Sequence, residues 1–459
     1  MTQRSQSQPA AAETIAGWLA ATGPAQLPTD TIETARRLIV DVAGLCIAAR
    51  HERYVRSTLA ATDAGHCTAL GHPHGVDPFG AALINGTAAH GEDYDDTFEG
   101  GPVHTGAVVV PAVLAACERE KLGGDRCLLG IVTGAELLCR LSLVAPKATH
   151  LAGFHPTAVF GALAAAGAVG AALRLTSEAL TSALGIAGSM ASGIIEYLAE
   201  GTWTKRMHAG WAAQSGVRAA LMARGGFIGP RTVLDGVHGF YRAFAPSATP
   251  DWKPLTDGLG SCWTMSSIAF KPYACGTMTQ PFIDCAIRLA EDGVPAEEIT
   301  EIVCEVGEGT VHRLWEPLAV KQCPPTSYAA KFSTPFCIAV SFFDRKAGKA
   351  QFSDERIRDP LVVALARKIR YEVNPEDEYP RNFTGHLRVT LRDGSTRDYR
   401  QPYLRGGVRA PLSAAELETK FLDNVLSGGW DQSRAERLLG WSHDVFALPG
   451  LTSLEEFRR

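Results

Sequence analysis

An apolar run from Thr157 to Leu173, rich in alanine and glycine, is the feature that most restricts how this chain can fold. A helix that is apolar on every side has to be buried. The run is too short to span a bilayer comfortably. It therefore predicts a helix at the centre of a globular protein, where small side chains let neighbouring backbones approach closely.

Helical spacing of apolar residues extends over nearly all of the first 260 residues, and no stretch there has the alternation of a strand. Thr29 or Asp30 is a plausible N-cap, and Pro156 suits the first turn of a helix that begins at His155. The predicted helices cover 13–21, 30–49, 77 up to the acidic stretch near 92, 104–121, 125–143, 155–173, 177–201 and 208–224.

The pattern changes after about residue 265. Residues 299–309 alternate in the manner of a strand, and 383–403 are typical of a hairpin around Asp393-Gly394. Helices are expected between these strands, at 278–291, 333–343 and 359–369. Helical spacing returns after Ser413, which is a candidate cap.

We therefore expect a mainly α protein. Its large all-helical domain is discontinuous in sequence, with a first part at 1–264 and a C-terminal return at 406–459. A smaller α+β lid domain is expected at 265–405. Two domains also suit a length of 459 residues.

Charge and cysteine content exclude several classes of function. A net charge of −5 with no basic stripe speaks against nucleic-acid binding. The eleven cysteines are odd in number and include no CxxC pair, which favours buried thiols in a reducing cytoplasm over disulfides or a zinc site. The N-terminal residues lack the apolar core of a signal peptide, and no membrane association is expected.

The stretch from His90 to Gly106 carries an unusual concentration of charge. Five acidic residues fall within eight positions: Glu92, Asp93, Asp95, Asp96 and Glu99. Like charges so close repel one another, and a strongly apolar helix follows directly. This arrangement predicts a polar site cut into an apolar body, and the alternative is a solvated acidic loop.

Two further stretches place ionisable groups beside apolar helices. His155 directly precedes the most apolar helix, where it is either a capping or core residue or a proton-transfer group. Lys205, Arg206 and His208 lie at the start of another helix, where free N–H groups and two cations suit an anion. The alternative there is an ordinary basic loop.

A third such stretch is AFKPYACG, in which Lys271 stands in an apolar turn at the expected domain junction. A lysine in an apolar cleft needs a partner, and a carboxylate substrate would supply one. Together the three stretches suit proton abstraction beside a carboxylate of a small di- or tricarboxylic acid. Cations would hold the carboxylates and stabilise the developing charge, while a histidine moves the proton.

Several strings in this chain resemble the MmgE/PrpD family, which includes 2-methylcitrate dehydratases, cis-aconitate decarboxylases and iminodisuccinate epimerases. The resemblance covers nearly the whole chain. It runs through HGEDYDDTFEGGPVHTGAVVVPAVLA, LAGFHPTAVFGALAAA, EGTWTKRMHAGWAAQSGVRAALMARGGFIGP, FKPYACG, KFSTPFCIAVSF and PLSAAELETKF. It implies a homodimer and chemistry without a metal or cofactor.

The resemblance also assigns residues. It implies catalytic roles for Asp93, Thr97, His104, His155, Lys205 and Lys271, and substrate binding by Arg206, His208 and Cys275. The segment between Thr97 and His104 is one residue longer than in the decarboxylases, which puts the placement of His104 in doubt. Cys275 and Gly276 stand where the decarboxylases place a histidine. We therefore expect a lyase, most simply a 2-methylcitrate- or citrate-type dehydratase; the alternatives are a cis-aconitate-type decarboxylase and an epimerase of a succinate-like acid.

Two rival hypotheses come from other classes. Asp95 to Glu99 fits the DDxxE pattern that holds magnesium in helical terpene synthases, although no second metal motif follows it. The other rival is a non-catalytic paralogue that only binds carboxylates.

Overall fold

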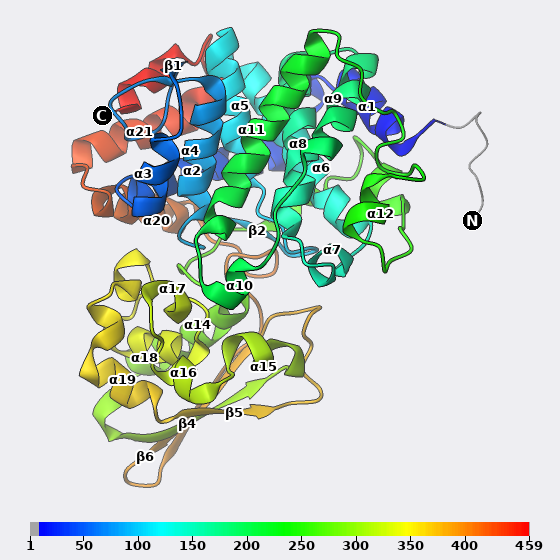
Figure 1. Ribbon diagram of the computed structural model, residues 1–459. Coiled ribbons are helices and arrows are strands. Elements are labelled where there is room, and N and C mark those ends of the chain that lie inside the picture. The colour runs from blue at the N-terminus through cyan, green and yellow to red at the C-terminus, as the bar shows by residue number, and fades with distance from the viewer. Residues whose placement is uncertain (1–8, 459) are drawn as a thin grey trace. The chain divides into compact units, whose positions relative to one another are not determined.

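The structure of the protein is a computed structural model that describes residues 9–458 (Figure 1). It is mainly helical with small sheets, as predicted. The chain forms two compact units. The first comprises the residues up to Gly91, Asp95–Ile268 and those from Leu417 onward, and the second comprises Glu92–Tyr94 and Ala269–Glu416.

The first unit consists of helices and two very short strands, β1 (Ala64–Cys67) and β2 (Thr97–Phe98). Strand β3 (Ile268–Ala269) and helix α20 (Ala414–Ser427) each contain residues of both units. The helices of the first unit are α1 (Ala11–Ala21), α2 (Thr29–Ala49), α3 (Arg53–Leu59), α4 (Pro78–His90), α5 (Gly106–Glu120), α6 (Gly124–Leu143), α7 (Ala148–Leu151), α8 (Pro156–Ala172), α9 (Ser177–Met190), α10 (Tyr197–Glu200), α11 (Thr204–Arg224), α12 (Phe240–Phe244), α13 (Lys253–Thr256) and α21 (Gln432–Asp444).

Helix α8 is the buried centre of the first unit, as the apolar run predicts. Every one of its residues is buried, and it packs against α5, α6, α9 and α11. Small residues allow comparably close contact elsewhere in the bundle. A Cβ atom on Gly86 of α4 would lie 2.6 Å from the Cα atom of Gly210 of α11. Because that distance is impossible for a real side chain, the crossing of α4 and α11 requires glycine there.

Helix α9 ends at Met190, whereas the sequence pattern predicts a helix to Gly201. Gly193 lies at φ +130°, outside the helical region. The following segment bonds instead to the chain ahead of α8. The N–H group of His155 donates to the carbonyl of Gly193 at 2.8 Å, and that of Ile195 donates to the carbonyl of Gly153 at 3.0 Å. The helix prediction is wrong at this point, and the break supports the position of His155.

A buried arginine joins α6 to the segment that follows α13. Nε of Arg140 donates to Oε1 of Glu136 at 2.5 Å, and its Nη atoms donate to the carbonyls of Asp257 and Cys262 at 2.8 and 2.6 Å. Oε2 of Glu136 accepts a hydrogen bond from the N–H group of Met265 at 2.9 Å. The ion pair is thus fully built into the interior of this unit.

The second unit contains a four-stranded sheet in the order β5-β4-β6-β7. Its strands are β4 (Ile299–Val306), β5 (Ile369–Val373), β6 (Gly385–Leu391) and β7 (Thr396–Gln401). The predicted hairpin is present, since β6 and β7 are antiparallel and Gly394 turns between them at φ +80°. Strand β5 pairs in parallel with β4, where the pattern predicts only the end of a helix.

Helices cover this sheet and extend the second unit. They are α14 (Gln280–Glu291), α15 (Glu308–Leu314), α16 (Leu318–Gln322), α17 (Ser327–Ala330), α18 (Thr334–Asp344) and α19 (Pro360–Ala366). Helix α14 packs against β6, β7 and α18. The predicted cap at Ser413 forms as well, because its Oγ accepts a hydrogen bond from the N–H group of Glu416 at 3.2 Å.

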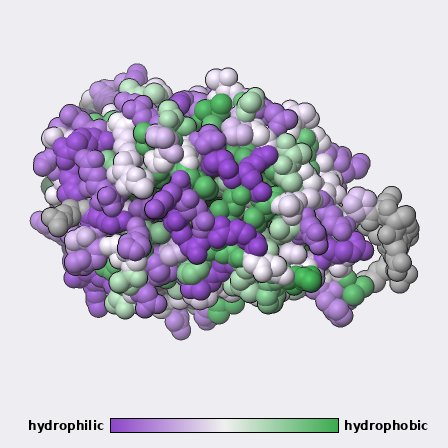
Figure 2. All heavy atoms as spheres, turned by 90° about the horizontal axis from the view of Figure 1, so that it is seen from above, coloured by the Kyte–Doolittle hydropathy of each residue, from purple (hydrophilic) through white to green (hydrophobic). Residues whose placement is uncertain are grey.

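The face of the molecule shown in Figure 2 is mostly hydrophilic, with hydrophobic residues gathered near its centre. Such a mixture is ordinary for a protein surface. Within the described residues, no helix has the length and apolar character needed to cross a membrane. Nine of the eleven cysteines are buried thiols, as predicted, and the exposed ones are Cys262 and Cys323.

Candidate functional site

Four buried histidines of the first unit form a group that we call the histidine cluster: His90, His104, His155 and His208. His90 is the last residue of α4, and His104 stands just ahead of α5. His155 is the N-cap of α8, and His208 lies near the beginning of α11. Helices α5 and α11 pack against each other and against both α4 and α8, so four helix ends from three stretches of the sequence each contribute one imidazole.

The imidazole rings are in direct contact. The ring centroids of His90 and His104 lie 4.8 Å apart, and those of His90 and His155 lie 5.5 Å apart with an interplanar angle of 20°. The Nδ1 atoms of His155 and His208 are 3.2 Å apart, which makes a hydrogen bond in which one ring donates and the other accepts. At least one of those two rings is therefore neutral.

Backbone and carboxylate oxygens orient two of the rings. Nδ1 of His90 lies 2.7 Å from Oδ2 of Asp95, and Nδ1 of His104 lies 2.7 Å from the carbonyl oxygen of Asp96. If each Nδ1 carries the hydrogen, each Nε2 presents a lone pair. Nε2 of His90 is buried and has no hydrogen-bond partner in the described part of the chain.

Burial and mutual repulsion keep two of these histidines neutral. Desolvation, followed by the charges of His90, His208, Lys205 and His104, lowers the pKa of His155 well below its usual 6.5. Desolvation, followed by the charges of His90 and Lys205, lowers the pKa of His208 to about 4. At neutral pH both rings can accept a proton, and once protonated both are strong acids.

The lowered pKa of His208 predicts a pH dependence of stability. The unfolded state binds more protons than the folded state between pH 6.5 and about pH 4, so the free energy of unfolding falls as the pH falls through this window. Each such group contributes at most about 1.4 kcal/mol per pH unit. His208→Gln lacks this contribution and is expected to lose less stability on acidification than the wild type. Thermal unfolding of both proteins at about pH 5 and about pH 7 measures the difference.

The comparison of wild type with His208→Gln is needed because Asp96 changes the pH dependence of stability in the opposite direction. Desolvation, followed by the charge of Asp95, raises the pKa of Asp96 to about 7, so this group favours the folded state as the pH falls. Asp96 is present in both proteins, and its effect cancels in their difference. An equal loss of stability in wild type and His208→Gln would contradict the assigned shift.

Asp96 holds the beginning of α5 in place. Its Oδ2 accepts hydrogen bonds from N and Oγ1 of Thr105 at 2.9 and 2.5 Å, and its Oδ1 accepts from N of Gly106 at 2.8 Å. A carboxylate at a helix N-terminus satisfies N–H groups that have no partner within the helix. The neighbouring His104 is thereby fixed at the edge of the histidine cluster.

In the second unit, two lysines bind the short segment Glu92–Tyr94. Nζ of Lys271 donates to the carbonyl of Asp93 at 2.9 Å and to its Oδ1 at 3.3 Å. Nζ of Lys331 donates to the carbonyl of Glu92 at 2.9 Å and lies 3.0 Å from its Oε2. Asp93 adopts φ +54°, a left-handed conformation that is rare outside glycine. Such a strained residue held by a buried cation is typical of a functional site.

The structure thus brings together His104, His155 and His208 in the first unit and Asp93 with Lys271 in the second. Lys205 is half-buried, and its charge acts on His155 and His208. That the histidines and the Asp93–Lys271 pair serve one substrate stays a prediction.

The other candidate residues have different surroundings. The guanidinium of Arg206 lies 4.4 Å from the ring centroid of Tyr54, a cation–π contact. Thr97 is buried in β2. Cys275 is buried in the second unit, where its thiol hydrogen-bonds with that of Cys337. Substrate binding by Arg206 and Cys275 stays a prediction.

Three groups of the site lie outside the predicted set: His90, Asp95 and Lys331. His90 and Asp95 both stand in the acidic stretch, and their spacing gives no sign that Asp95 turns back to the ring of His90. Lys331 begins the string KFSTPFCIAVSF. Lys331 stands among apolar residues, and a lysine in an apolar stretch is the same signal that singles out Lys271.

The burial of the acidic stretch excludes a solvated loop. Asp95 and Asp96 are fully buried, and Asp93 is 2% exposed. The DDxxE hypothesis loses support too, because Asp96 caps α5 and Asp95 bonds to His90. Within residues 9–458, the acids of this motif do not form a group of three potential metal ligands.

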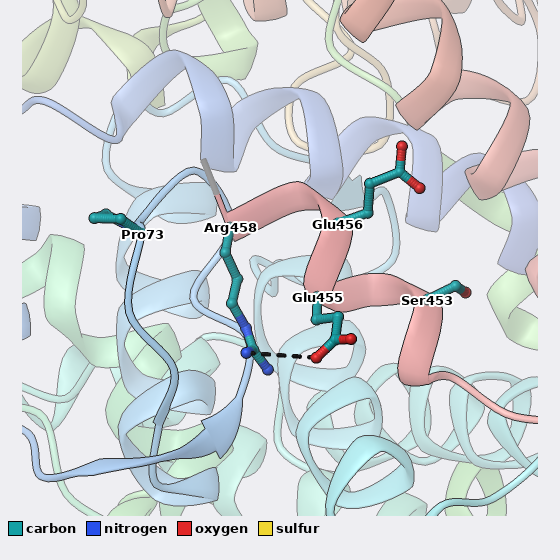
Figure 3. Close-up of a pocket in the computed structure, with 5 residues that line it drawn as sticks. All are labelled: Pro73, Ser453, Glu455, Glu456 and Arg458. Atoms are coloured by element: carbon teal, nitrogen blue, oxygen red, sulfur yellow. Dashed lines mark ion pairs between the residues drawn. The ribbon is translucent and has the colours of Figure 1, made fainter.

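A hollow of about 580 Å³ lies elsewhere on the first unit, lined by Pro73, Ser453, Glu455, Glu456 and Arg458 (Figure 3). Nη1 of Arg458 lies 3.7 Å from Oε2 of Glu455 in an ion pair. No residue of the histidine cluster lines this hollow. Its size alone gives no chemical role, because the glutamates that line it are largely exposed to solvent.

Comparison with known proteins finds similarity to one family, MmgE/PrpD, over most of the chain. The model of the MmgE/PrpD N-terminal domain matches residues 13–253, and that of the MmgE/PrpD C-terminal domain matches residues 273–440. The chain is 28% identical to the cis-aconitate decarboxylase of Aspergillus terreus, over 96% of this chain and 94% of that protein. It is 30% identical to the cis-aconitate decarboxylase of Mus musculus over 76% and 72% of the two chains, and 29% identical to that of Homo sapiens over 89% and 84%.

Proposed function

We propose, because the chain belongs to the MmgE/PrpD family, that it is a lyase that decarboxylates a small unsaturated tricarboxylic acid of the cis-aconitate type. The observation that carries this proposal is the histidine cluster. Neutral imidazoles in a buried site are suited to moving a proton to or from carbon near neutral pH.

The reaction requires one carbon–carbon bond to break and one carbon–hydrogen bond to form. The bonding electrons stay on the organic acid as carbon dioxide leaves, and a proton is added at carbon. A histidine such as His155 with a lowered pKa gives up an acquired proton readily. Cations near the carboxylates stabilise the negative charge that develops on the substrate, a role that suits Lys205 and Lys271.

The names of the relatives support a decarboxylase, whereas the differences at Cys275 and Gly276 favour a dehydratase. All three relatives described above carry the name cis-aconitate decarboxylase. The opposing signal is the presence of Cys275 and Gly276, where the family resemblance implies a histidine in the decarboxylases. Four histidines already lie together in the first unit, so an acid from that position is dispensable for proton transfer.

The test is proton NMR of the protein with cis-aconitate, citrate, 2-methylcitrate and iminodisuccinate, each in heavy water. Decarboxylation of cis-aconitate should yield a dicarboxylate with one deuterium on carbon, together with carbon dioxide. If only 2-methylcitrate or citrate reacts, and it releases water, the protein is a dehydratase and the decarboxylase proposal is wrong. Deuterium uptake without net reaction would identify an epimerase.

Binding of cis-aconitate without turnover of any acid would contradict the enzyme hypothesis and support the non-catalytic paralogue. A tricarboxylate such as citrate serves as the binding control in calorimetry. The homodimer and chemistry without metal or cofactor stay predictions from the resemblance. The cytoplasmic location stays a prediction from the cysteine content and the N-terminal residues.

A further inference from the structure

We propose that His90, His104 and His155 bind a divalent transition-metal ion, best Zn²⁺, and that this ion acts as an inhibitor rather than a cofactor. One ring nitrogen from each of the three histidines lies within 4.8 Å of one from each of the others. Imidazole nitrogen is the commonest protein ligand of Zn²⁺, and three histidines with one open position make a complete zinc site.

The geometry needs little adjustment. Zn²⁺ holds nitrogen ligands at about 2.0–2.1 Å in a tetrahedral arrangement, which puts two ligand atoms about 3.3 Å apart. The most distant pair would therefore close by roughly 1.5 Å. The ring of His90 is in contact with both others, at centroid distances of 4.8 and 5.5 Å.

Two of the three hydrogen bonds made by the Nδ1 atoms are typical of a zinc site. Metal-binding histidines usually donate their other N–H group to a carboxylate or a carbonyl, which fixes the ring and its tautomer. Here Nδ1 of His90 bonds to the carboxylate of Asp95, and Nδ1 of His104 bonds to the carbonyl of Asp96. Nδ1 of His155 bonds to Nδ1 of His208. A metal bound through the Nε2 atoms would leave the Nδ1 atoms available for these bonds.

One atom points independently to a ligand. The side chain of His90 is 0% exposed, so water does not reach its Nε2 atom. Within the described residues this atom has no hydrogen-bond partner. A buried polar atom without a partner is costly, and a bound cation would remove that cost. The side chain of His104 is 11% exposed, so the edge of the site is open to a small ion.

Occupation of this site would stop the proposed chemistry. A lone pair that is coordinated to Zn²⁺ cannot accept a proton, so turnover should fall and a chelator should restore it. This consequence depends on the proposed function, whereas binding of the ion does not. The two are therefore tested by different measurements.

Binding is tested on the chelator-treated full-length protein by calorimetric titration with Zn²⁺ and by visible absorption after addition of Co²⁺. We expect one site per chain and the intense bands of four-coordinate Co²⁺. His90→Gln removes a ligand and should abolish the bands. Asp95→Asn removes the carboxylate behind His90 and should weaken affinity about ten- to hundredfold. His238→Gln, a change at an exposed histidine, is the matched control and should bind as the wild type does.

Equal affinity in wild type and His90→Gln, or the weak bands of six-coordinate Co²⁺, would overturn the proposal, because the ion would then sit at a surface site. If His90→Gln does not fold, anomalous diffraction from wild-type crystals soaked in Zn²⁺ decides between a peak among the three rings and none. Binding with unchanged turnover would leave the metal site standing and contradict the assigned role of the histidines in proton transfer.

Discussion

His155→Gln is expected to lose about a hundredfold or more in turnover of the true substrate while the protein keeps its fold. The ring of His155 contacts those of His90 and His208, and its lowered pKa keeps it neutral near pH 7. Glutamine retains a donor and an acceptor of similar reach but cannot carry a proton. The loss should appear in kcat more than in KM, because the proton is transferred only during the chemical step.

The matched control for this variant is His238→Gln, which alters an exposed histidine of the first unit. It should retain wild-type turnover. Circular dichroism and thermal unfolding show whether His155→Gln is folded, since His155 also caps α8 through backbone contacts that glutamine preserves. A folded His155→Gln protein with near-normal kcat would remove His155 from the proposed mechanism.

Arg140→Met is expected to cost about 3–5 kcal/mol in the free energy of unfolding. The side chain of Arg140 is 2% exposed, and it binds Glu136 and backbone carbonyls of residues 254–262. Methionine has similar bulk, but it leaves the Glu136 carboxylate buried without its cation. Urea unfolding followed by circular dichroism measures the loss.

Arg437→Met is the matched control, because Arg437 pairs with Glu456 at 3.2 Å while both side chains are more than half exposed. Removal of an exposed pair should cost about 1 kcal/mol or less. The double change Glu136→Leu and Arg140→Met should recover part of the loss, since no unpaired charge then remains. Equal losses in Arg140→Met and Arg437→Met would show that the buried pair is unimportant.

Local pattern was sufficient to predict much of the fold. The absence of charge from Thr157 to Leu173 predicts that α8 is buried, because a helix without a polar face has no side to turn to water. Asp393-Gly394 predicts the β6–β7 hairpin because few residues adopt a positive φ as readily as Gly394 does. In both cases the structure depends on residues close together in sequence.

The features that were missed depend on distant residues. β5 forms because one edge of β4 is available for parallel pairing. The sequence at 369–373 does not reveal this. α9 stops at Met190 because the next residues bond to the chain ahead of α8. The histidines His104, His155 and His208 were identified by their neighbours in sequence, whereas the role of His90 emerges only when four helix ends meet.

The order of the chain has a consequence for any attempt to divide this protein. The matched C-terminal domain spans 273–440, yet the residues from Leu417 onward belong to the first compact unit. There Nζ of Lys420 lies 2.6 Å from Oδ1 of Asp41 in α2, and both side chains are buried. A gene fragment that stops near residue 268 would encode a helical bundle without the residues from Leu417 onward. In that fragment the buried Asp41 would lack Lys420. Recombination between relatives would therefore preserve folding only if the final segment is inherited together with the beginning of the chain.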